Sequence, residues 1–243
     1  MPTMRLLLGS GGTATDERVR IYRKMASEHF SDCSEVLFIP FASHDHASYT
    51  SKMQKFLGED GPKLVAIDPS SPFESVRRME AIYVGGGNSF LLVKELHERG
   101  LVEPIRERVS SGMPYLGVSA GSNVACPTIM TTNDMPIAFP PSLISLGLVP
   151  FQINPHYHPG RIRFLDGEDI VEHFGETRSK RISEFHKVSD IPVLGMWEGS
   201  FVTWDGSRGL LTGRATAFFK DQEKQDLEDG DAFDSNLVRL DQS

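Results

Sequence analysis

Ser119 lies in the segment Gly117-Val118-Ser119-Ala120-Gly121, which matches the G-x-S-x-G pattern of a nucleophilic serine. The flanking glycines allow a strand to turn abruptly into a helix, which exposes the serine hydroxyl at the edge of a sheet. The backbone N–H of Ala120 then points toward the same space and can donate a hydrogen bond to an oxyanion. The pattern also fits an ordinary tight turn, so a catalytic role requires a base, an acid and a second oxyanion donor elsewhere in the chain.

A second glycine-rich segment, VGGGN at residues 84–88, ends another apolar run. Its glycines leave backbone N–H groups unobstructed, so Gly87 can supply the second oxyanion donor, while Asn88 can hold the loop or a substrate. The alternatives are a plain turn between strand and helix, or a phosphate-binding loop. The segment fits neither the dinucleotide fingerprint nor a P-loop, and GSGG at residues 9–12 lacks a partner motif. We therefore expect no bound nucleotide.

The serine needs a general base, and His156 in the segment INPHYHPG is the best candidate among the histidines. We expect it in a loop after a short strand, where a neutral imidazole can take the serine proton and return it to a leaving amine. His158, two residues after His156, raises the alternative of a metal site, and so does the segment His44-Asp45-His46. Neither group has an accompanying cysteine or a helical H-E-x-x-H spacing, so we expect surface loop histidines and no metal.

Two carboxylates are candidates for the acid that orients the base. Asp134 lies in the segment TTNDMP, and Glu198 follows a buried apolar run in GMWEGS. Either can accept a hydrogen bond from the imidazole Nδ1–H and stabilise the imidazolium. Asp134 can instead cap a turn, and Glu198 can be a solvated turn residue. The residues alone do not choose between them.

The elements that must position these side chains alternate along the chain. Apolar runs without polar alternation predict buried strands, and amphipathic segments between them predict helices. The strands are expected within residues 5–9, 35–43, 63–68, 81–84, 113–118 and 148–154, and later within 191–197, 200–206, 208–213 and 215–220; the helices are expected within 14–30, 49–61, 89–100, 101–112 and 177–188.

This alternation predicts an α/β fold, a parallel sheet covered by helices on both faces, in one domain that spans residues 1–243. The loops GSGG, GGGN and SAGS all follow strands, so they are expected at the same rim of the sheet, where ligands bind. The segment WDGSRG predicts a hairpin between two later strands. Residues 127–159 are rich in proline and are expected as ordered loops, and the acidic tail at residues 221–234 is expected at the surface.

Composition excludes several classes of function. The 243 residues are 39% hydrophobic and 24% charged, which is typical of a globular protein, and the net charge of −8 argues against binding to nucleic acid or anionic membrane. No apolar run reaches membrane-spanning length, and the N-terminal run is too short for a secretion signal. Cys33 and Cys126 are too few for a disulfide framework, so we expect buried thiols and a cytoplasmic protein.

Several unusual segments in order resemble one family. The segments IYVGGGNSFLLVKELHERGL, YLGVSAGSNVACPTIMTTNDMPI, QINPH and GETRSKRI are similar to peptidase E, the α-aspartyl dipeptidase family of serine peptidases. The match is clearest from residue 81 to residue 182. The resemblance implies a three-layer α/β/α sandwich with a mostly parallel sheet, related to class I glutamine amidotransferases. It also implies hydrolysis of dipeptides with an N-terminal aspartate, without metal or cofactor.

The resemblance assigns roles to individual residues. Ser119 matches the nucleophile and His156 the general base, while Gly87 and Ala120 match the oxyanion donors. Both Asp134 and Glu198 match proposed third members of the triad, so the choice stays open. Arg178 matches the arginine of the family's GETR motif and implies a clamp for the substrate β-carboxylate.

One departure from the family pattern concerns residues 157–175, which are longer than the bacterial pattern between the histidine and GETR. This length leaves open how Arg178 reaches the site and whether the segment is a lid. Two rival functions remain: a related hydrolase for β-aspartyl or cyanophycin-type peptides, and a non-enzymatic protein that binds a small ligand on a flavodoxin-like fold. The expected partners are small acidic dipeptides, with the chain as a monomer or homodimer.

Overall fold

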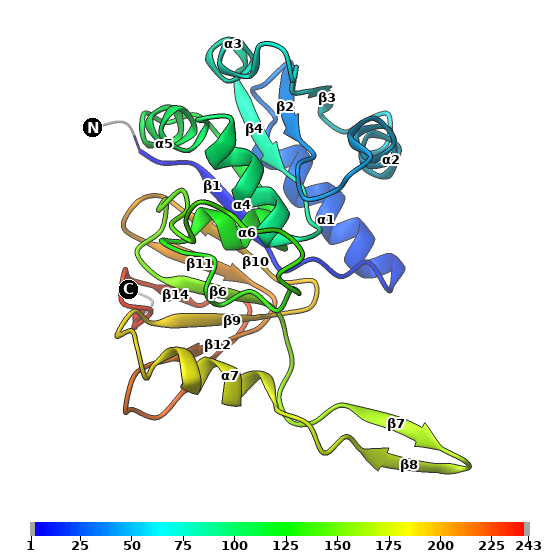
Figure 1. Ribbon diagram of the computed structural model, residues 1–243, viewed down its shortest axis with the longest axis vertical. Helices are drawn as coiled ribbons and strands as arrows, with labels where there is room; N and C mark the ends of the chain where they lie inside the picture. The colour runs from blue at the N-terminus through cyan, green and yellow to red at the C-terminus, as the bar shows by residue number, and fades with distance from the viewer. Residues whose placement is uncertain (1–2, 241–243) are drawn as a thin grey trace.

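The computed structural model describes residues 3–240 and contains the predicted parallel sheet (Figure 1). Its first five strands are short and run parallel. Four of them are mostly buried, whereas the edge strand at residues 63–66 is partly exposed. The five strands are β1 (Leu6–Gly9), β2 (Glu35–Ile39), β3 (Lys63–Ala66), β4 (Ala81–Val84) and β5 (Tyr115–Val118), in the order β1-β5-β4-β2-β3. The prediction of these strands is confirmed.

Seven helices accompany the strands within residues 3–240, and side-chain caps define several of their starts. Thr15, Asp45, Asn88 and Thr177 each accept a hydrogen bond from a backbone N–H of the following turn. The helices are α1 (Asp16–His29), α2 (His46–Leu57), α3 (Pro72–Arg78), α4 (Ser89–Glu98), α5 (Val102–Ser110), α6 (Ala120–Ala125) and α7 (Arg178–Phe185). The helix α3 was not predicted, and α2 begins at His46, so that residue is helical and not part of a loop.

Helices cover both faces of the sheet. Leu6 and Leu8 of β1 pack in one core cluster with residues of α4, α5 and α6, while Leu7 packs in a second cluster with residues of α1 and α2. Because successive side chains of a strand point to opposite faces, this division places the helices in two separate layers. The expected three-layer α/β/α sandwich is confirmed.

The C-terminal strands extend the main sheet and build a second one. Antiparallel strands β10 (Phe201–Trp204), β11 (Gly209–Thr212), β14 (Ala232–Phe233) and β15 (Arg239–Leu240) continue the main sheet beyond β1. The predicted hairpin joins β10 and β11. The second sheet contains β6 (Gln152–Tyr157), β9 (Val193–Trp197), β12 (Ala215–Phe218) and β13 (Gln225–Leu227), with β6 and β9 parallel. Only three residues separate β9 from β10, so this turn links the two sheets.

Three further expectations need correction. His156 lies within strand β6 and not in a loop after it, because β6 extends to residue 157 to pair with β9. The acidic tail is not wholly at the surface, since Leu227, Ala232 and Phe233 in it are buried in the sheets. Cys126 is buried as expected, but Cys33 is partly exposed.

The long segment between the histidine and GETR contains a two-stranded hairpin, β7 (Arg163–Asp166) and β8 (Asp169–Glu172). Figure 1 shows it projecting from the body of the protein at the lower right. Its strands are almost entirely exposed and pair only with each other in the described chain. Among residues 3–240, no helix is both long enough and apolar enough to cross a bilayer.

Candidate active site

Ser119 occupies the sharp turn between β5 and α6. Its backbone has φ 56° and ψ −110°, a conformation that costs a non-glycine residue on the order of 1–3 kcal/mol. Both flanking glycines are required by close packing, because a Cβ at Gly117 would clash with the carbonyl of Gly121, and one at Gly121 would clash with the carbonyl of Val84. The turn therefore holds the serine hydroxyl in a fixed place above the sheet.

His156 lies directly beside the serine. Its Nε2 is 2.8 Å from Ser119 Oγ. The residue has φ 57° and stands at an irregularity of β6 between Asn154 and Tyr157, where the register with β9 shifts. Its backbone N–H donates to Ser10 Oγ at 2.8 Å, and that hydroxyl donates to the carbonyl of Met196. The irregular backbone thus directs the imidazole toward Ser119.

Glu198 completes the line of contacts. Its Oε1 lies 2.8 Å from His156 Nδ1. A carboxylate only accepts, so Nδ1 carries the proton and Nε2 is free to accept from the Ser119 hydroxyl. The hydrogen bond from His156 lowers the pKa of Glu198, against the opposing effect of burial. Because that pKa is depressed, this stabilising contribution is present above the ordinary value of 4.5 and is lost as the pH falls through the lower value.

The GSGG loop supports this acid. Gly199, the residue after Glu198, donates its N–H to the carbonyl of Gly11 at 2.6 Å. A Cβ on Gly12 would overlap the Glu198 carboxylate, and one on Gly11 would lie 3.0 Å from the imidazole Cε1 of His156. The two glycines allow close approach of the loop to the imidazole–carboxylate pair. The sequence pattern revealed a small-residue loop at the rim but not this role.

Asp134 is not part of the line. Its Oδ2 accepts hydrogen bonds from the backbone N–H of Ser89 at 2.7 Å and from Thr132 Oγ1 at 3.0 Å. The carboxylate therefore satisfies the first N–H group of α4 and holds the loop before it. His156 forms no hydrogen bond with Asp134. The structure brings Ser119, His156 and Glu198 together and leaves Asp134 at the start of a helix.

The two expected oxyanion donors flank the serine. Gly87 has φ 129°, and a Cβ there would clash with the carbonyl of Ala42. Within residues 3–240, no protein group accepts a hydrogen bond from the Gly87 N–H. Ala120 is the first residue of α6, so its N–H has no partner within the helix. The neighbouring Gly86 packs against Ser119, since a Cβ on it would lie 3.2 Å from the serine Cβ.

The two substrate-binding candidates differ in their surroundings. The Asn88 side chain accepts from the N–H of Leu91 and donates to the carbonyl of Met135 at 2.8 Å, so it holds the loop. Arg178 is the first residue of α7 and is half-buried. Burial, and then the nearby charge of Arg181, lower its pKa, while Asp134 opposes this effect. Arg178 forms no ion pair with a described residue and remains available to an anion.

A cavity of about 320 Å³ opens beside the serine. Sequence patterns did not reveal its walls, because the lining side chains of α1 and α2 resemble ordinary core-facing positions of amphipathic helices. The lining residues are Gly11, Gly12, Thr13, Tyr22, Tyr49, Lys52, Met53, Phe56, Tyr83, Gly86, Gly87, Val118, Ser119 and His156. No group of three or more His, Cys, Asp or Glu side chains in the described chain is arranged to hold a metal ion.

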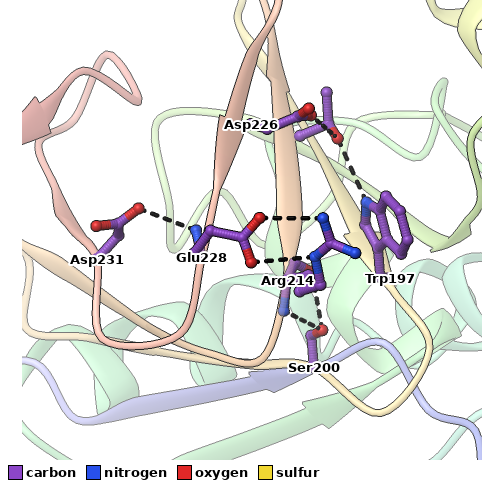
Figure 2. A network of polar contacts seen from close by, with 7 residues as sticks. Trp197, Ser200, Arg214, Asp226, Glu228 and Asp231 are labelled. Atoms are coloured by element: carbon purple, nitrogen blue, oxygen red, sulfur yellow. Dashed lines mark hydrogen bonds and ion pairs between the residues drawn. The ribbon is translucent and has the colours of Figure 1, made fainter.

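A polar network around Arg214 holds the turn that carries Glu198 (Figure 2). The guanidinium lies 4.3 Å from the ring centroid of Trp197 and pairs with both oxygens of Glu228 at 3.1 and 3.0 Å. The Arg214 backbone accepts from the N–H of Trp197 and exchanges two hydrogen bonds with the hydroxyl of Ser200. Arg214 thus contacts the residues on both sides of the Glu198–Gly199 turn.

We expect Arg214→Met to lower kcat about three- to tenfold with little change in KM, because the loss of the cation–π and carboxylate contacts loosens the Glu198 turn. Arg214→Lys should restore part of kcat, since an ammonium keeps the charge but not the two-pronged contact. Steady-state kinetics would measure both. Arg208→Met is the matched control, as Arg208 lies in the β10–β11 hairpin turn; equal losses in Arg208→Met and Arg214→Met would contradict the prediction.

Comparisons with known proteins place the chain in a family. The model of peptidase family S51 matches residues 6–212. A peptidase E from Nostoc sp. (strain PCC 7120) is 42% identical over 97% of both chains. A probable alpha-aspartyl dipeptidase from Drosophila melanogaster is 45% identical over 75% of this chain and 74% of its own.

Solved structures agree on the fold. The crystal structure of a peptidase from an acI-B1 Actinobacterium has a TM-score of 0.68 with 16% identity, and the match covers 96% of this chain and 97% of that one. At this identity the likeness concerns the fold alone. The family match covers most of the chain and includes the serine turn, the histidine strand and the glutamate turn. The chain therefore belongs to peptidase family S51.

Proposed function

We propose that the chain is a serine exopeptidase that removes an N-terminal aspartate from Asp-Xaa dipeptides. The observation that carries the proposal is the unbroken line of contacts from Ser119 Oγ to His156 Nε2 and from His156 Nδ1 to Glu198 Oε1, each 2.8 Å long. A serine, an imidazole and a carboxylate in this order are the parts required for acyl transfer. The side chains of His156 and Glu198 are 36% and 38% exposed, so a substrate can reach them.

The proposed reaction has two halves. Ser119 Oγ attacks the peptide carbonyl while His156 takes its proton, and the N–H groups of Gly87 and Ala120 stabilise the oxyanion. The C–N bond then breaks, His156 gives the proton to the leaving amine, and an aspartyl ester remains on Ser119. In the second half, water attacks this ester with His156 again as base, which releases aspartate and frees the serine. Glu198 holds the imidazole in the required tautomer throughout.

The proposed specificity rests on one cation. Arg178 is half-buried and forms no ion pair with a described residue, which suits a clamp on the β-carboxylate of an N-terminal aspartate. The name of the relative from Drosophila, a probable alpha-aspartyl dipeptidase, supports the same substrate class. A cytoplasmic location is part of the proposal, in keeping with the free thiols of Cys33 and Cys126.

We expect the protein to hydrolyse Asp-Leu with a kcat/KM about 10- to 100-fold above that for Asn-Leu, because only aspartate offers a charged partner to Arg178. Arg178→Met should remove most of this preference, whereas Lys180→Met, an exposed change on the same helix, should retain it. The rate of leucine release from each dipeptide would give kcat/KM for the wild type and for both variants. Equal cleavage of Asp-Leu and Asn-Leu by the wild type would contradict the assignment, and a preference for β-linked Asp-Leu would favour the β-aspartyl alternative.

A further inference from the structure

The cavity beside Ser119 has mainly aromatic and apolar walls, and the ammonium group of Lys52 also lines it. Its outer wall comes from α1 and α2 and contains Tyr22, Tyr49, Met53 and Phe56. The lining residues include no aspartate or glutamate. No described carboxylate forms an ion pair with Lys52, which is exposed at the second turn of α2. Such a surface suits an apolar group that carries a negative charge at one end.

The wall is preformed and electrically neutral. The hydroxyls of Tyr22 and Tyr83 are hydrogen-bonded to each other, and Tyr49 donates its hydroxyl to the carbonyl of Gly86 at 3.0 Å. Phe56 packs edge-to-face on Tyr22 with ring centroids 5.0 Å apart. Burial raises the pKa of Tyr49 to about 12, so its hydroxyl stays protonated. The shape of the cavity is thus held by contacts that are already made in the free protein.

The position of the cavity relative to His156 indicates which half of a substrate it receives. His156 must give its proton to the leaving amine, so the leaving residue lies against the imidazole. The cavity is lined by His156 and by Gly11, which packs on the imidazole. Of the described residues that line it, none is Asn88 or Arg178. The cavity is therefore separate from the expected aspartate clamp.

We infer that this cavity is the subsite for the second residue of the dipeptide, with Lys52 Nζ bound to its C-terminal carboxylate. The inference rests on the proposed function and adds two preferences to it. An aromatic or aliphatic second side chain gains apolar burial against Tyr49, Met53 and Phe56. A free carboxylate at the second residue forms an ion pair with the Lys52 ammonium. Dipeptides are therefore favoured over longer peptides, which have an amide group at that position.

The test compares Asp-Phe with its C-terminal amide, Asp-Phe-NH2, for the wild type and Lys52→Met. We expect the wild type to prefer Asp-Phe by about tenfold or more in kcat/KM, mainly through KM, because only the acid pairs with the ammonium. Lys52→Met should lower kcat/KM for Asp-Phe by about tenfold and leave that for Asp-Phe-NH2 unchanged. Lys55→Met is the matched control, since Lys55 is exposed on the same helix and does not line the cavity.

Different outcomes overturn different statements. An equal loss on acid and amide in Lys52→Met would overturn the carboxylate contact, and so would no loss on either. Phe56→Ala should lower kcat/KM for Asp-Phe relative to Asp-Ala; an unchanged ratio would overturn the assignment of the apolar wall. Thermal unfolding of each variant separates these results from loss of the fold. Absence of turnover of both substrates by the wild type would overturn the proposed function, and the subsite with it.

Discussion

Replacing Ser119 by alanine is expected to lower kcat/KM for Asp-Leu by about 10⁴-fold or more, because no other group can form the acyl intermediate. The fold should survive, since the side chain of Ser119 makes one hydrogen bond, to His156, and alanine fits the same space. The free energy of unfolding should change by about 1 kcal/mol or less. Leucine release and thermal unfolding would measure the two effects.

Covalent labelling gives an independent check on the same residue. A fluorophosphonate should modify the wild type at Ser119 and leave Ser119→Ala unmodified, because the reagent needs the activated hydroxyl. Hydrolysis of Asp-Leu by the alanine variant at the wild-type rate would exclude Ser119 as the nucleophile. Loss of both activity and thermal transition would instead indicate a structural role for the turn.

Glu198→Gln is expected to lower kcat by about 10³- to 10⁴-fold, whereas Asp134→Asn should change it by less than about tenfold. Glutamine has nearly the same shape as glutamate, but its amide can donate to Nδ1 and so favours the wrong imidazole tautomer. Asparagine at residue 134 keeps an oxygen that can accept from the N–H of Ser89. Steady-state kinetics at constant pH would compare the pair.

The matched pair decides which acid serves the base. The contact from Glu198 to His156 and the position of Asp134 at the start of α4 both favour the stated order of effects. A large loss in Asp134→Asn with near-normal activity in Glu198→Gln would reverse the assignment. Asp134→Asn should lower the thermal unfolding temperature more clearly than it lowers kcat, since this carboxylate accepts from the first N–H group of α4 and holds the loop that contains it.

Local patterns in the sequence were sufficient for most elements of the fold. The five parallel strands are continuous apolar runs, and the helices between them begin at capping residues such as Thr15 and Asn88. The sharp turn at Ser119 was also predictable, since its two glycines have a specific steric role. The hairpin β7–β8 was missed because its residues alternate weakly and its strands pair only with each other in the described chain. Helix α3 was missed because it is a seven-residue helix.

The choice of the acid and the walls of the cavity depend on contacts between distant segments. Glu198 and His156 are 42 residues apart, and the second sheet that unites β6 with β9 has no signature in either strand alone. Asp134 stands in a segment as polar and as close to the nucleophile helix as a triad acid would be. Lys52 belongs to a helix whose polar face looks like any solvated face. Their catalytic and binding roles stay predictions.

Ser119 and His156 both have a positive backbone φ, at 56° and 57°, which is unfavourable for residues other than glycine. The unfavourable backbone conformation sets the direction of each side chain, and the packing of the neighbouring strands maintains that conformation. Glycine would remove the steric strain at either position, but it would also raise the entropy of the unfolded chain and delete the side chain that the proposed reaction needs. Stabilising mutations are therefore expected away from Ser119 and His156, where backbone strain is retained because the proposed reaction needs both side chains.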